Sequence, residues 1–418
     1  MRVLYLNPVG TVGGAEKSLL DILEALRIAE PEWRLGLIAG GEGPLTAKAA
    51  SIGVFAKEVR LPRAIAALGD AGNPGWGSLA RRAVLLGRCL RAAAYSIPYL
   101  IRLSGAIRDF APDVIHSNGF KMHLLGLWSR PRGTPVIWHI RDYVSSRPVM
   151  KRLLRSQGGR CSLAIANSVS VEGDIRRVFG PEVETCCIYN VVDLSRYAPV
   201  GAQADVDRLS GLQPAEPGTV RVGLVATFAR WKGHEVFLKA IARMQPLGLR
   251  LRAYVIGGPI YQTEGSQLDL GALRQFAADL GIGDRVGFTG FIEDTASAMR
   301  ALDVIVHAST EPEPFGRVIA EGMACGRPVI SSATGGAHEL IQENYNALVH
   351  PPGDHVVLAE RIAELVGDRD LRIRMGRAGR ITAESRFERS RLARQLVPIY
   401  RRIAAPRESR VPAESLLH

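Results

Sequence analysis

The sequence predicts an α/β protein with two Rossmann-like, doubly wound domains facing a cleft. Its 418 residues are enough for two or three domains at roughly 100–200 residues each. Short aliphatic and β-branched runs alternate with longer helical patterns, which is typical of a parallel sheet covered on both faces. This alternation lapses over residues 196–218 and then starts again. The pattern therefore favours two domains of the same architecture.

The expected strands are short apolar runs, each followed by a turn or a helical pattern. In the first domain they are Val3–Asn7, Leu35–Ala39, Val114–Ser117, Val136–His139 and Leu163–Asn167. In the second domain they are Val220–Ala226, Arg252–Ile256, Val286–Phe288, Val304–His307 and Pro328–Ser331. The predicted boundaries are 1–195 for the first domain, 196–218 for a linker, 219–385 for the second domain, 386–404 for a C-terminal helix that could pack back on the first domain, and 405–418 for a tail.

Composition and charge restrict the class of protein and of partner. Hydrophobic residues make up 47% and charged residues 22%, which excludes disordered and fibrous chains. The 53 Lys and Arg exceed the 41 Asp and Glu by 12, which favours anionic partners such as phosphorylated ligands, nucleic acid or an anionic membrane surface. Five scattered cysteines, and no expected signal peptide or membrane span, predict a cytoplasmic protein.

A glycine-rich turn, Gly10–Glu16, follows the first strand and includes Gly13 and Gly14. Glycines at this place let the backbone approach a ligand, and the N–H groups at the start of the next helix attract a phosphate or a sugar oxygen. The turn lacks the Gly-Lys-Ser/Thr ending of a Walker motif and the spacing of a dinucleotide site. An ordinary turn explains it as well.

His139 ends one of the expected strands, and His116 and Asn118 end the strand before it. Ligands of open α/β sheets bind beyond the carboxyl ends of the strands, so these side chains are expected to be neighbours in a cleft. His139 is therefore a candidate for substrate contact. A structural histidine bonded to the backbone is an equally good explanation of the position.

Arg230 and Lys232 lie directly after the first strand of the second domain, beside Gly233. Two cations at a helix start can neutralise a diphosphate and stabilise it as a leaving group. The alternative is an ordinary pair of solvated surface charges. Their position after this strand favours the first interpretation.

The most specific motif runs from Ser309 to Ile330 and contains two acids, Glu313 and Glu321. Glu313 precedes a helix that Gly316 opens, and Glu321 lies one to two turns inside it. Two carboxylates so placed could bind hydroxyl groups at two points of one extended ligand. The backbone N–H groups of Phe315–Arg317 would point at its phosphate.

This set of motifs resembles the retaining glycosyltransferases of family 4, which have the two-domain GT-B fold. The resemblance covers most of the chain. Besides the motifs above, it rests on Asn190–Leu194, on Thr334–Gly336 and on Glu339. It implies an acceptor-side first domain, a second domain that binds a nucleotide sugar, and a transfer that retains the anomeric configuration.

The resemblance also implies roles for individual residues. The expected catalytic set is His139 at the transferred sugar, Lys232 at the pyrophosphate, Arg230 beside it, and Glu313 at the sugar hydroxyls. The expected donor-binding set has four parts. Gly13 and Gly14 would lie at the donor phosphate, and Phe291 and Ile292 at the nucleobase. Phe315, Gly316, Arg317 and Val318 would contact the sugar and phosphate, and Glu321 the ribose hydroxyls.

One departure from the family pattern concerns the cations. The family usually has an arginine where this chain has Thr227, and Arg230 is the residue that could supply the missing charge. In the mechanism commonly proposed for the family, the acceptor attacks on the face that the diphosphate leaves, and a phosphate oxygen takes its proton. No cofactor and no metal are expected. The two Asp-x-Asp runs, at Asp205–Asp207 and Asp368–Asp370, are expected to be solvated surface.

Two other functions stay open. A sugar-nucleotide epimerase or hydrolase of the same fold is one, and the Glu313 to Glu321 run argues against it. A non-catalytic homologue with the GT-B fold is the other, supported only by Thr227. Release of free sugar without an acceptor would favour the first of these.

The acceptor is expected to be a glycan or polysaccharide precursor, which could be lipid-linked. Arg81, Arg88 and Arg91 fall on one side of a helical wheel beside leucines, a pattern that fits a basic amphipathic helix on the inner face of a membrane. A helix with its arginines in solvent fits equally well. Nucleic acid is not an expected partner, because no recognised motif accompanies the charge.

Overall fold

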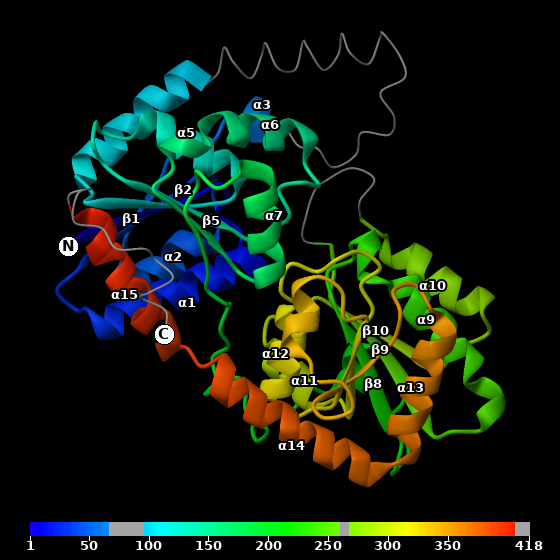
Figure 1. Ribbon diagram of the computed structural model, residues 1–418. Coiled ribbons are helices and arrows are strands. Elements are labelled where there is room, and N and C mark those ends of the chain that lie inside the picture. The colour runs from blue at the N-terminus through cyan, green and yellow to red at the C-terminus, as the bar shows by residue number, and fades with distance from the viewer. Residues whose placement is uncertain (67–95, 260–266, 406–418) are drawn as a thin grey trace, which may run out of the picture. The chain divides into compact units, whose positions relative to one another are not determined.

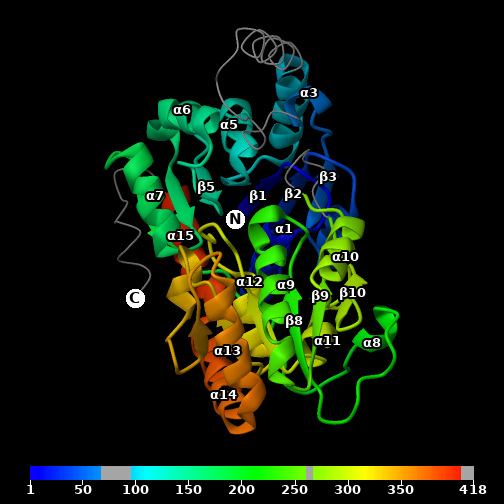
Figure 2. The same ribbon diagram turned by 90° about the vertical axis from the view of Figure 1, so that its right-hand side faces the viewer.

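The computed structural model describes residues 1–66, 96–259 and 267–405 (Figure 1). The chain forms two compact units. The first unit consists of Met1–Asn190 and the C-terminal segment that starts at Arg389, and the second unit is Val191–Glu388. Each unit is a parallel β-sheet covered by helices (Figure 2).

The sheet of the first unit has seven strands in the order β3-β2-β1-β4-β5-β6-β7. Neighbouring strands all pair in parallel. The strands are β1 Arg2–Asn7, β2 Arg34–Ala39, β3 Phe55–Glu58, β4 Val114–Asn118, β5 Val136–Ile140, β6 Leu163–Ala166 and β7 Thr185–Cys187. The strand order reverses between β1 and β4, so the loops after these two strands flank the switch point where ligands of such sheets bind.

The helices of the first unit cover this sheet and include one from the end of the chain. They are α1 Gly14–Ala29, α2 Pro44–Ser51, α3 Arg63–Ala66, α5 Phe120–Ser129, α6 Pro148–Gln157, α7 Val169–Phe179 and α15 Ser390–Ala404, and residues 96–110 are also helical. In α15, Leu392, Leu396, Tyr400 and Ile403 are buried at helical spacing. This apolar face packs α15 against α1 and β4.

The sheet of the second unit has six strands in the order β10-β9-β8-β11-β12-β13, again all parallel. They are β8 Val220–Val225, β9 Leu251–Ile256, β10 Val286–Gly290, β11 Val304–His307, β12 Val329–Ser331 and β13 Ala347–Val349. The order reverses between β8 and β11. The switch point of this unit therefore lies beyond the ends of those two strands.

The helices of the second unit lie before, between and after its strands in the sequence. They are α8 Val206–Leu209, α9 His234–Arg243, α10 Leu270–Asp279, α11 Thr295–Arg300, α12 Arg317–Ala324, α13 His355–Gly367 and α14 Arg369–Arg386, with a 3₁₀ turn η2 at Arg230–Lys232. In each unit, buried apolar residues at alternate strand positions, which share one face of the sheet, pack with the helices into a separate core.

The predicted fold class, two Rossmann-like doubly wound domains, is confirmed. Each of the ten expected strands matches an observed strand, with ends that differ by at most two residues. Three strands at or near sheet edges, β3, β7 and β13, were not expected. β3 shows why, because none of its four residues is buried and it lacks an apolar run.

One expectation about a residue within the predicted linker is wrong. Residues 196–218 belong to the second unit, and Asp207 in α8 is buried rather than solvated. Its carboxylate accepts hydrogen bonds from Arg221 Nη2 at 2.9 Å, Arg252 Nη1 at 2.7 Å and the Tyr254 hydroxyl at 2.5 Å. Burial alone would raise the pKa of Asp207, but these donors hold it well below its usual range.

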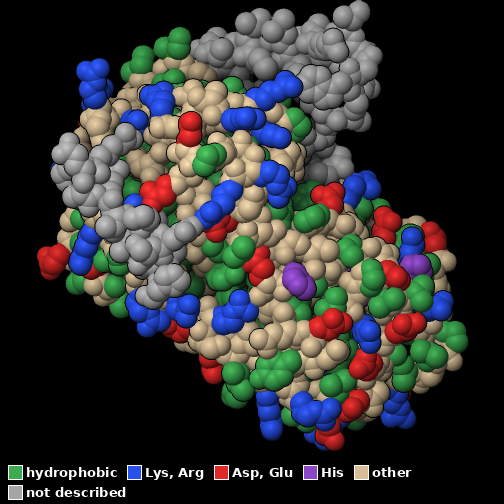
Figure 3. Space-filling model, in the orientation of Figure 1, with side chains coloured by type: hydrophobic (Ala, Val, Ile, Leu, Met, Phe, Trp, Pro, Cys, Tyr) green, Lys and Arg blue, Asp and Glu red, His purple; other side chains and the backbone are tan. Residues whose placement is uncertain are grey.

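The surface of the two units differs in charge. On the face shown in Figure 3, Lys and Arg side chains predominate over the first unit and mix with acidic ones over the second. Within the described part of the chain, no helix is both long and apolar enough to cross a membrane. The expected basic helix with Arg81, Arg88 and Arg91 lies outside the described residues.

Candidate functional site

An ion pair lies at the switch point of the second sheet. Lys232 ends the η2 turn that follows β8, and Glu313 lies in the loop that follows β11. Lys232 Nζ donates to Glu313 Oε2 at 2.5 Å, and the two side chains are only 22% and 15% exposed. Two residues 81 positions apart in the sequence are thus brought into contact where a ligand of this fold is expected.

The loop that carries Lys232 is fixed against the end of β11. Gly233 has φ +74°, and a Cβ on it would lie 1.9 Å from the carbonyl oxygen of Ala308. Only glycine fits this close approach. Next to it, the Thr310 backbone N–H donates to the Trp231 carbonyl at 2.8 Å. These contacts fix the position of the backbone at Lys232.

Glu313 is held by its own set of donors. The Ser309 hydroxyl donates to Glu313 Oε2 at 3.0 Å, and His307 Nε2 lies 3.4 Å from the same oxygen. The Glu313 backbone N–H donates to the Thr334 carbonyl at 3.2 Å. Burial would raise the pKa of Glu313, but the charge of Lys232 and the bond from His307 hold it well below its usual range. Glu313 is therefore an ionised hydrogen-bond acceptor.

Helix α12 begins directly after this loop. Gly316 caps it with φ +91°, and Phe315 is buried just before it, so both residues lie at the positive end of the helix dipole with Val318 in the first turn. Further along, Arg317 Nη2 lies 3.1 Å from Glu321 Oε1. Glu321 is buried and already paired, so a ribose hydroxyl would share this carboxylate with Arg317.

Phe291 and Ile292 follow β10, two strands away from β8 in the sheet. The Phe291 side chain is 63% exposed, which is unusual for a large aromatic residue and leaves its ring face open to a flat ligand. Arg230 starts the same turn as Lys232 and is exposed. Along the carboxyl edge of the sheet, the order is therefore Phe291, Lys232 and Glu313.

In the first unit, the glycine turn is held by buried polar groups. The Gly13 backbone N–H donates to Glu16 Oε2 at 3.1 Å, and Asn7 Nδ2 donates to Glu16 Oε1 at 3.2 Å. Asn118, at the end of β4, donates through Nδ2 to Asn7 Oδ1 at 2.7 Å. Gly13 and Gly14 thus lie at the switch point between β1 and β4.

His139, at the end of β5, is buried and has close polar neighbours. Its Nδ1 lies 3.0 Å from His116 Nε2 and 3.3 Å from Arg141 Nη2. Arg141 also donates to Asn118 Oδ1 at 2.9 Å and to Asn190 Oδ1 at 2.5 Å. Burial, reinforced by the charge of Arg141, lowers the pKa of His139 well below its usual value. His139 is therefore neutral.

Several of these neighbours were missed by sequence reasoning. Arg141 stands in the same short run as His139, so spacing along the strand end could have signalled it. His307 ends an expected strand and Ser309 begins the motif that contains Glu313, so their positions could have signalled both residues. Tyr400, which contacts His116 from α15, has no local signal because 284 residues separate the two. No cluster of three or more metal-ligating side chains occurs in the part of the chain that the structure describes.

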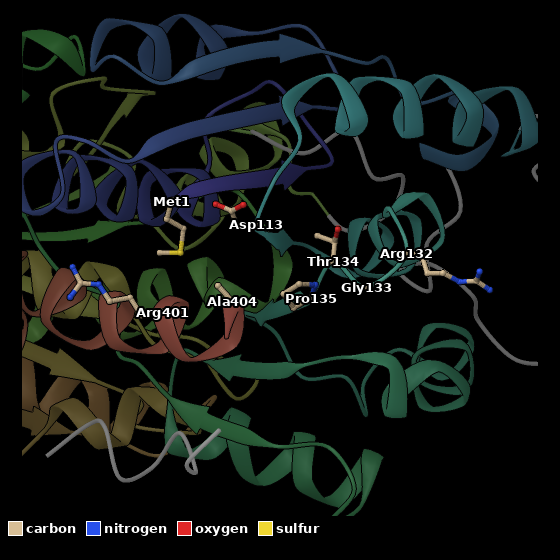
Figure 4. A pocket seen from close by; sticks show the side chains of 8 residues that line it. All are labelled: Met1, Asp113, Arg132, Gly133, Thr134, Pro135, Arg401 and Ala404. Carbon is tan, nitrogen blue, oxygen red and sulfur yellow. The ribbon is translucent and has the colours of Figure 1, made fainter. Parts of the chain in front are cut away.

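A shallow hollow of about 570 Å³ lies at the end of the first sheet opposite to the carboxyl ends of its strands (Figure 4). Its lining comes from residues just before β1, β4 and β5 and from the end of α15: Met1, Asp113, Arg132, Gly133, Thr134, Pro135, Arg401 and Ala404. Asp113 pairs with Arg2 and Arg401 with Glu30, so its charges are partly neutralised. It lies at the amino ends of the strands, away from the edge where ligands of this fold bind.

Comparison with known proteins agrees with this geometry. A solved structure of Anabaena HepE, in complex with UDP and glucose, matches 96% of this chain and 99% of that chain, with a TM-score of 0.76 and 25% identity. The two doubly wound units therefore define a GT-B glycosyltransferase fold. The family described as "Glycosyltransferase Family 4" matches residues 12–196, and that described as "Glycosyl transferases group 1" matches residues 213–382. The chain belongs to glycosyltransferase family 4.

Two curated relatives illustrate the range of the family. The lipopolysaccharide core biosynthesis glycosyltransferase LpsE of Rhizobium meliloti is 31% identical over 47% of this chain and 53% of its own length. A GDP-mannose-dependent alpha-(1-6)-phosphatidylinositol monomannoside mannosyltransferase of Mycobacterium tuberculosis is 31% identical over 58% of this chain and 63% of its own length. The match thus spans about half to two thirds of these relatives.

Proposed function

We propose that this chain transfers a sugar from a nucleotide diphosphate sugar to a glycan or lipid-linked acceptor, with retention of the anomeric configuration. The second unit binds the donor and the first unit binds the acceptor. The observation that supports this most strongly is the Lys232–Glu313 pair at the switch point of the second sheet. It combines a cation for phosphate with an ionised acceptor for sugar hydroxyls.

The order of residues along the sheet edge matches the order of groups in such a donor. Phe291 offers an aromatic face to the base, Lys232 offers a positive charge to the diphosphate, and Glu313 accepts hydrogen bonds from the sugar. The start of α12 adds the positive end of its dipole. Binding the diphosphate at Lys232 would loosen its contact with Glu313 and free that carboxylate for the sugar.

The reaction breaks the bond between the anomeric carbon and a phosphate oxygen of the donor. The acceptor hydroxyl forms the new bond on the same face, and its proton passes to the departing phosphate oxygen. Lys232, Arg230 and the α12 N-terminus stabilise the charge that develops on the diphosphate. Because these groups supply positive charge themselves, we propose that transfer needs no metal, and that activity persists in excess chelator.

The acceptor proposal is supported by the relatives and by charge. Both curated relatives are named for acceptors that are lipopolysaccharide core or a phosphatidylinositol mannoside. The predominance of Lys and Arg over the first unit in Figure 3 suits an anionic membrane surface. We propose a peripheral protein on the inner face of the membrane. Sedimentation with anionic but not with neutral liposomes would support this. No sedimentation with either kind of liposome would refute it.

A binding experiment tests the donor site. Uridine, guanosine and adenosine diphosphates and their sugar derivatives are screened by thermal shift and then titrated by calorimetry. Glu313→Gln should weaken binding of the nucleotide sugar but not of the nucleoside diphosphate, because Glu313 contacts the sugar. The exposed Glu311 provides the matched control, Glu311→Gln. Absence of binding by all of these ligands would refute the proposal and favour a non-catalytic homologue, and release of free sugar without an acceptor would favour an epimerase or hydrolase.

A further inference from the structure

A buried chain of hydrogen bonds connects α15 to the end of β5. The Tyr5 and Tyr400 hydroxyls lie 2.7 Å apart, and the Tyr400 hydroxyl lies 2.7 Å from His116 Nδ1. His116 Nε2 in turn lies 3.0 Å from His139 Nδ1. All four side chains are at most 1% exposed. The four groups are therefore shielded from solvent.

Arg141 sets the direction of the chain. A guanidinium group has only donors, and Arg141 Nη2 lies 3.3 Å from His139 Nδ1. Nδ1 of His139 is therefore an acceptor. Since His139 is neutral and holds a single ring proton, that proton is on Nε2.

The rest of the chain follows from this one assignment. His116 must donate to His139 through its own Nε2, because His139 Nδ1 has no proton to give. Burial, with the charge of Arg141, also lowers the pKa of His116 well below its usual value, so His116 is neutral and its Nδ1 is an acceptor. Tyr400 then donates to His116, and Tyr5 donates to Tyr400.

We propose that Tyr400 and His116 are positioning residues that hold His139 in the Nε2–H tautomer, so that His139 meets its ligand as a hydrogen-bond donor. Nε2 of His139 is buried and has no hydrogen-bond partner within the described residues. A buried donor of this kind calls for an oxygen acceptor, such as a sugar hydroxyl or a phosphate oxygen. His139 in this form cannot remove a proton through Nε2, which agrees with a reaction in which the phosphate takes the proton.

The tautomers can be measured without any assay of activity. Long-range proton–nitrogen spectra of ¹⁵N-histidine-labelled protein show which ring nitrogen carries the proton, and His116→Gln and His139→Gln assign the signals. We expect Nε2–H for both His116 and His139. A proton on Nδ1 of His139, or on both of its nitrogens, would overturn the proposal.

Substitutions separate the positioning role from a general loss of packing. Tyr400→Phe removes the hydroxyl that donates to His116 Nδ1, so His116 should populate its second tautomer. Tyr5→Phe leaves the Tyr400 donor in place and should leave both tautomers unchanged. Tyr254→Phe, which removes a buried hydroxyl in the second unit, is the control for stability. Unchanged histidine signals in Tyr400→Phe would refute the role of Tyr400.

The consequence for turnover rests on the proposed function. Tyr400→Phe should lower kcat roughly fivefold, which is the equivalent of one buried hydrogen bond, with little change in KM for the donor. His116→Gln keeps an N–H near the position of Nε2 and should retain more activity than His116→Asn, which does not. Equal activity of these two variants would contradict the positioning role. A protein that shows the expected tautomers but transfers no sugar would refute the proposed function instead.

Discussion

Replacing Lys232 by alanine removes the cation that lies 2.5 Å from Glu313 at the switch point of the second sheet. In the proposed reaction, this cation stabilises the departing diphosphate. One positioned group of this kind is typically worth about 10²–10³ in kcat, or roughly 3–4 kcal/mol. We therefore expect Lys232→Ala to lower kcat by about two to three orders of magnitude, while the α/β fold is retained.

The same change removes a partner of Glu313 in the ligand-free protein. At 2.5 Å and an effective dielectric constant of about 20, the attraction is about 7 kcal/mol before desolvation is counted. Breaking a fully buried pair usually costs about 3–5 kcal/mol. Because these two side chains keep 22% and 15% of their exposure, we expect the free energy of unfolding to fall by about 2–4 kcal/mol.

This loss depends on pH in a defined direction. The pKa of Glu313 is lowered in the folded state, in spite of its burial, mainly by the charge of Lys232. Its stabilising contribution is therefore fully present above the unfolded pKa of about 4.3 and is lost as the pH falls through the folded value. The difference in stability between wild type and Lys232→Ala should be full at about pH 7 and should shrink below about pH 4.3.

Two measurements check these expectations. Release of nucleoside diphosphate from the donor gives kcat, and urea unfolding at several pH values gives the free energy of unfolding. Lys239→Ala, on the exposed side of the neighbouring helix α9, is the matched control: it should leave kcat unchanged and, because Lys239 lies over the Phe276 ring, lower the free energy of unfolding by at most about 1 kcal/mol. A folded Lys232→Ala protein that kept more than roughly a tenth of the wild-type kcat would refute the role given to Lys232.

Three further changes have expected outcomes. Gly233→Ala places a Cβ 1.9 Å from the carbonyl oxygen of Ala308 at φ +74°, so the transition in thermal unfolding should move down and donor binding should be lost. Asp207→Asn removes the buried charge that accepts from two arginines, so urea unfolding should show a loss of about 3–5 kcal/mol at neutral pH that shrinks as the pH falls below about 4. Phe291→Ala should weaken binding of a nucleoside diphosphate by about 1–3 kcal/mol in calorimetry, as expected for loss of one base stacked on an aromatic ring.

Each of these expectations has a contrary result. Tight donor binding by Gly233→Ala would mean that the Lys232 turn does not need its close approach to β11. Wild-type stability of Asp207→Asn at neutral pH would mean that this ion cluster contributes little. Unchanged affinity in Phe291→Ala would mean that the nucleobase does not bind against Phe291 after β10.

Central strands could be predicted from the sequence because burial on both faces leaves uninterrupted apolar runs, as in Val304–His307. The edge strand β3 could not, since solvent on its sides removes that signal. The burial of Asp207 could not be predicted for a related reason. Its polar, proline-rich surroundings resemble a linker, and the arginines that bury its charge lie 14 and 45 residues away.

The candidate site was predictable where its residues follow strands. Lys232 and Glu313 lie after β8 and β11, and parallel strands bring such positions to one edge regardless of sequence distance. The contact between them, and the hydrogen bonds from His307 and Ser309 to Glu313, became visible only in the three-dimensional structure. Tyr400 had no sequence signal, because its pattern in α15 reads as one more buried aromatic residue of an amphipathic helix.

The most direct test follows one complete reaction by nuclear magnetic resonance, with the nucleotide sugar that binds best and a lipid-linked glycan acceptor. The nucleoside diphosphate and the glycosylated product are quantified together, and the coupling at the anomeric proton reports the configuration. We predict equal amounts of both, with the anomeric configuration of the donor retained. Nucleoside diphosphate with free sugar, or a product of inverted configuration, would contradict the proposed transfer.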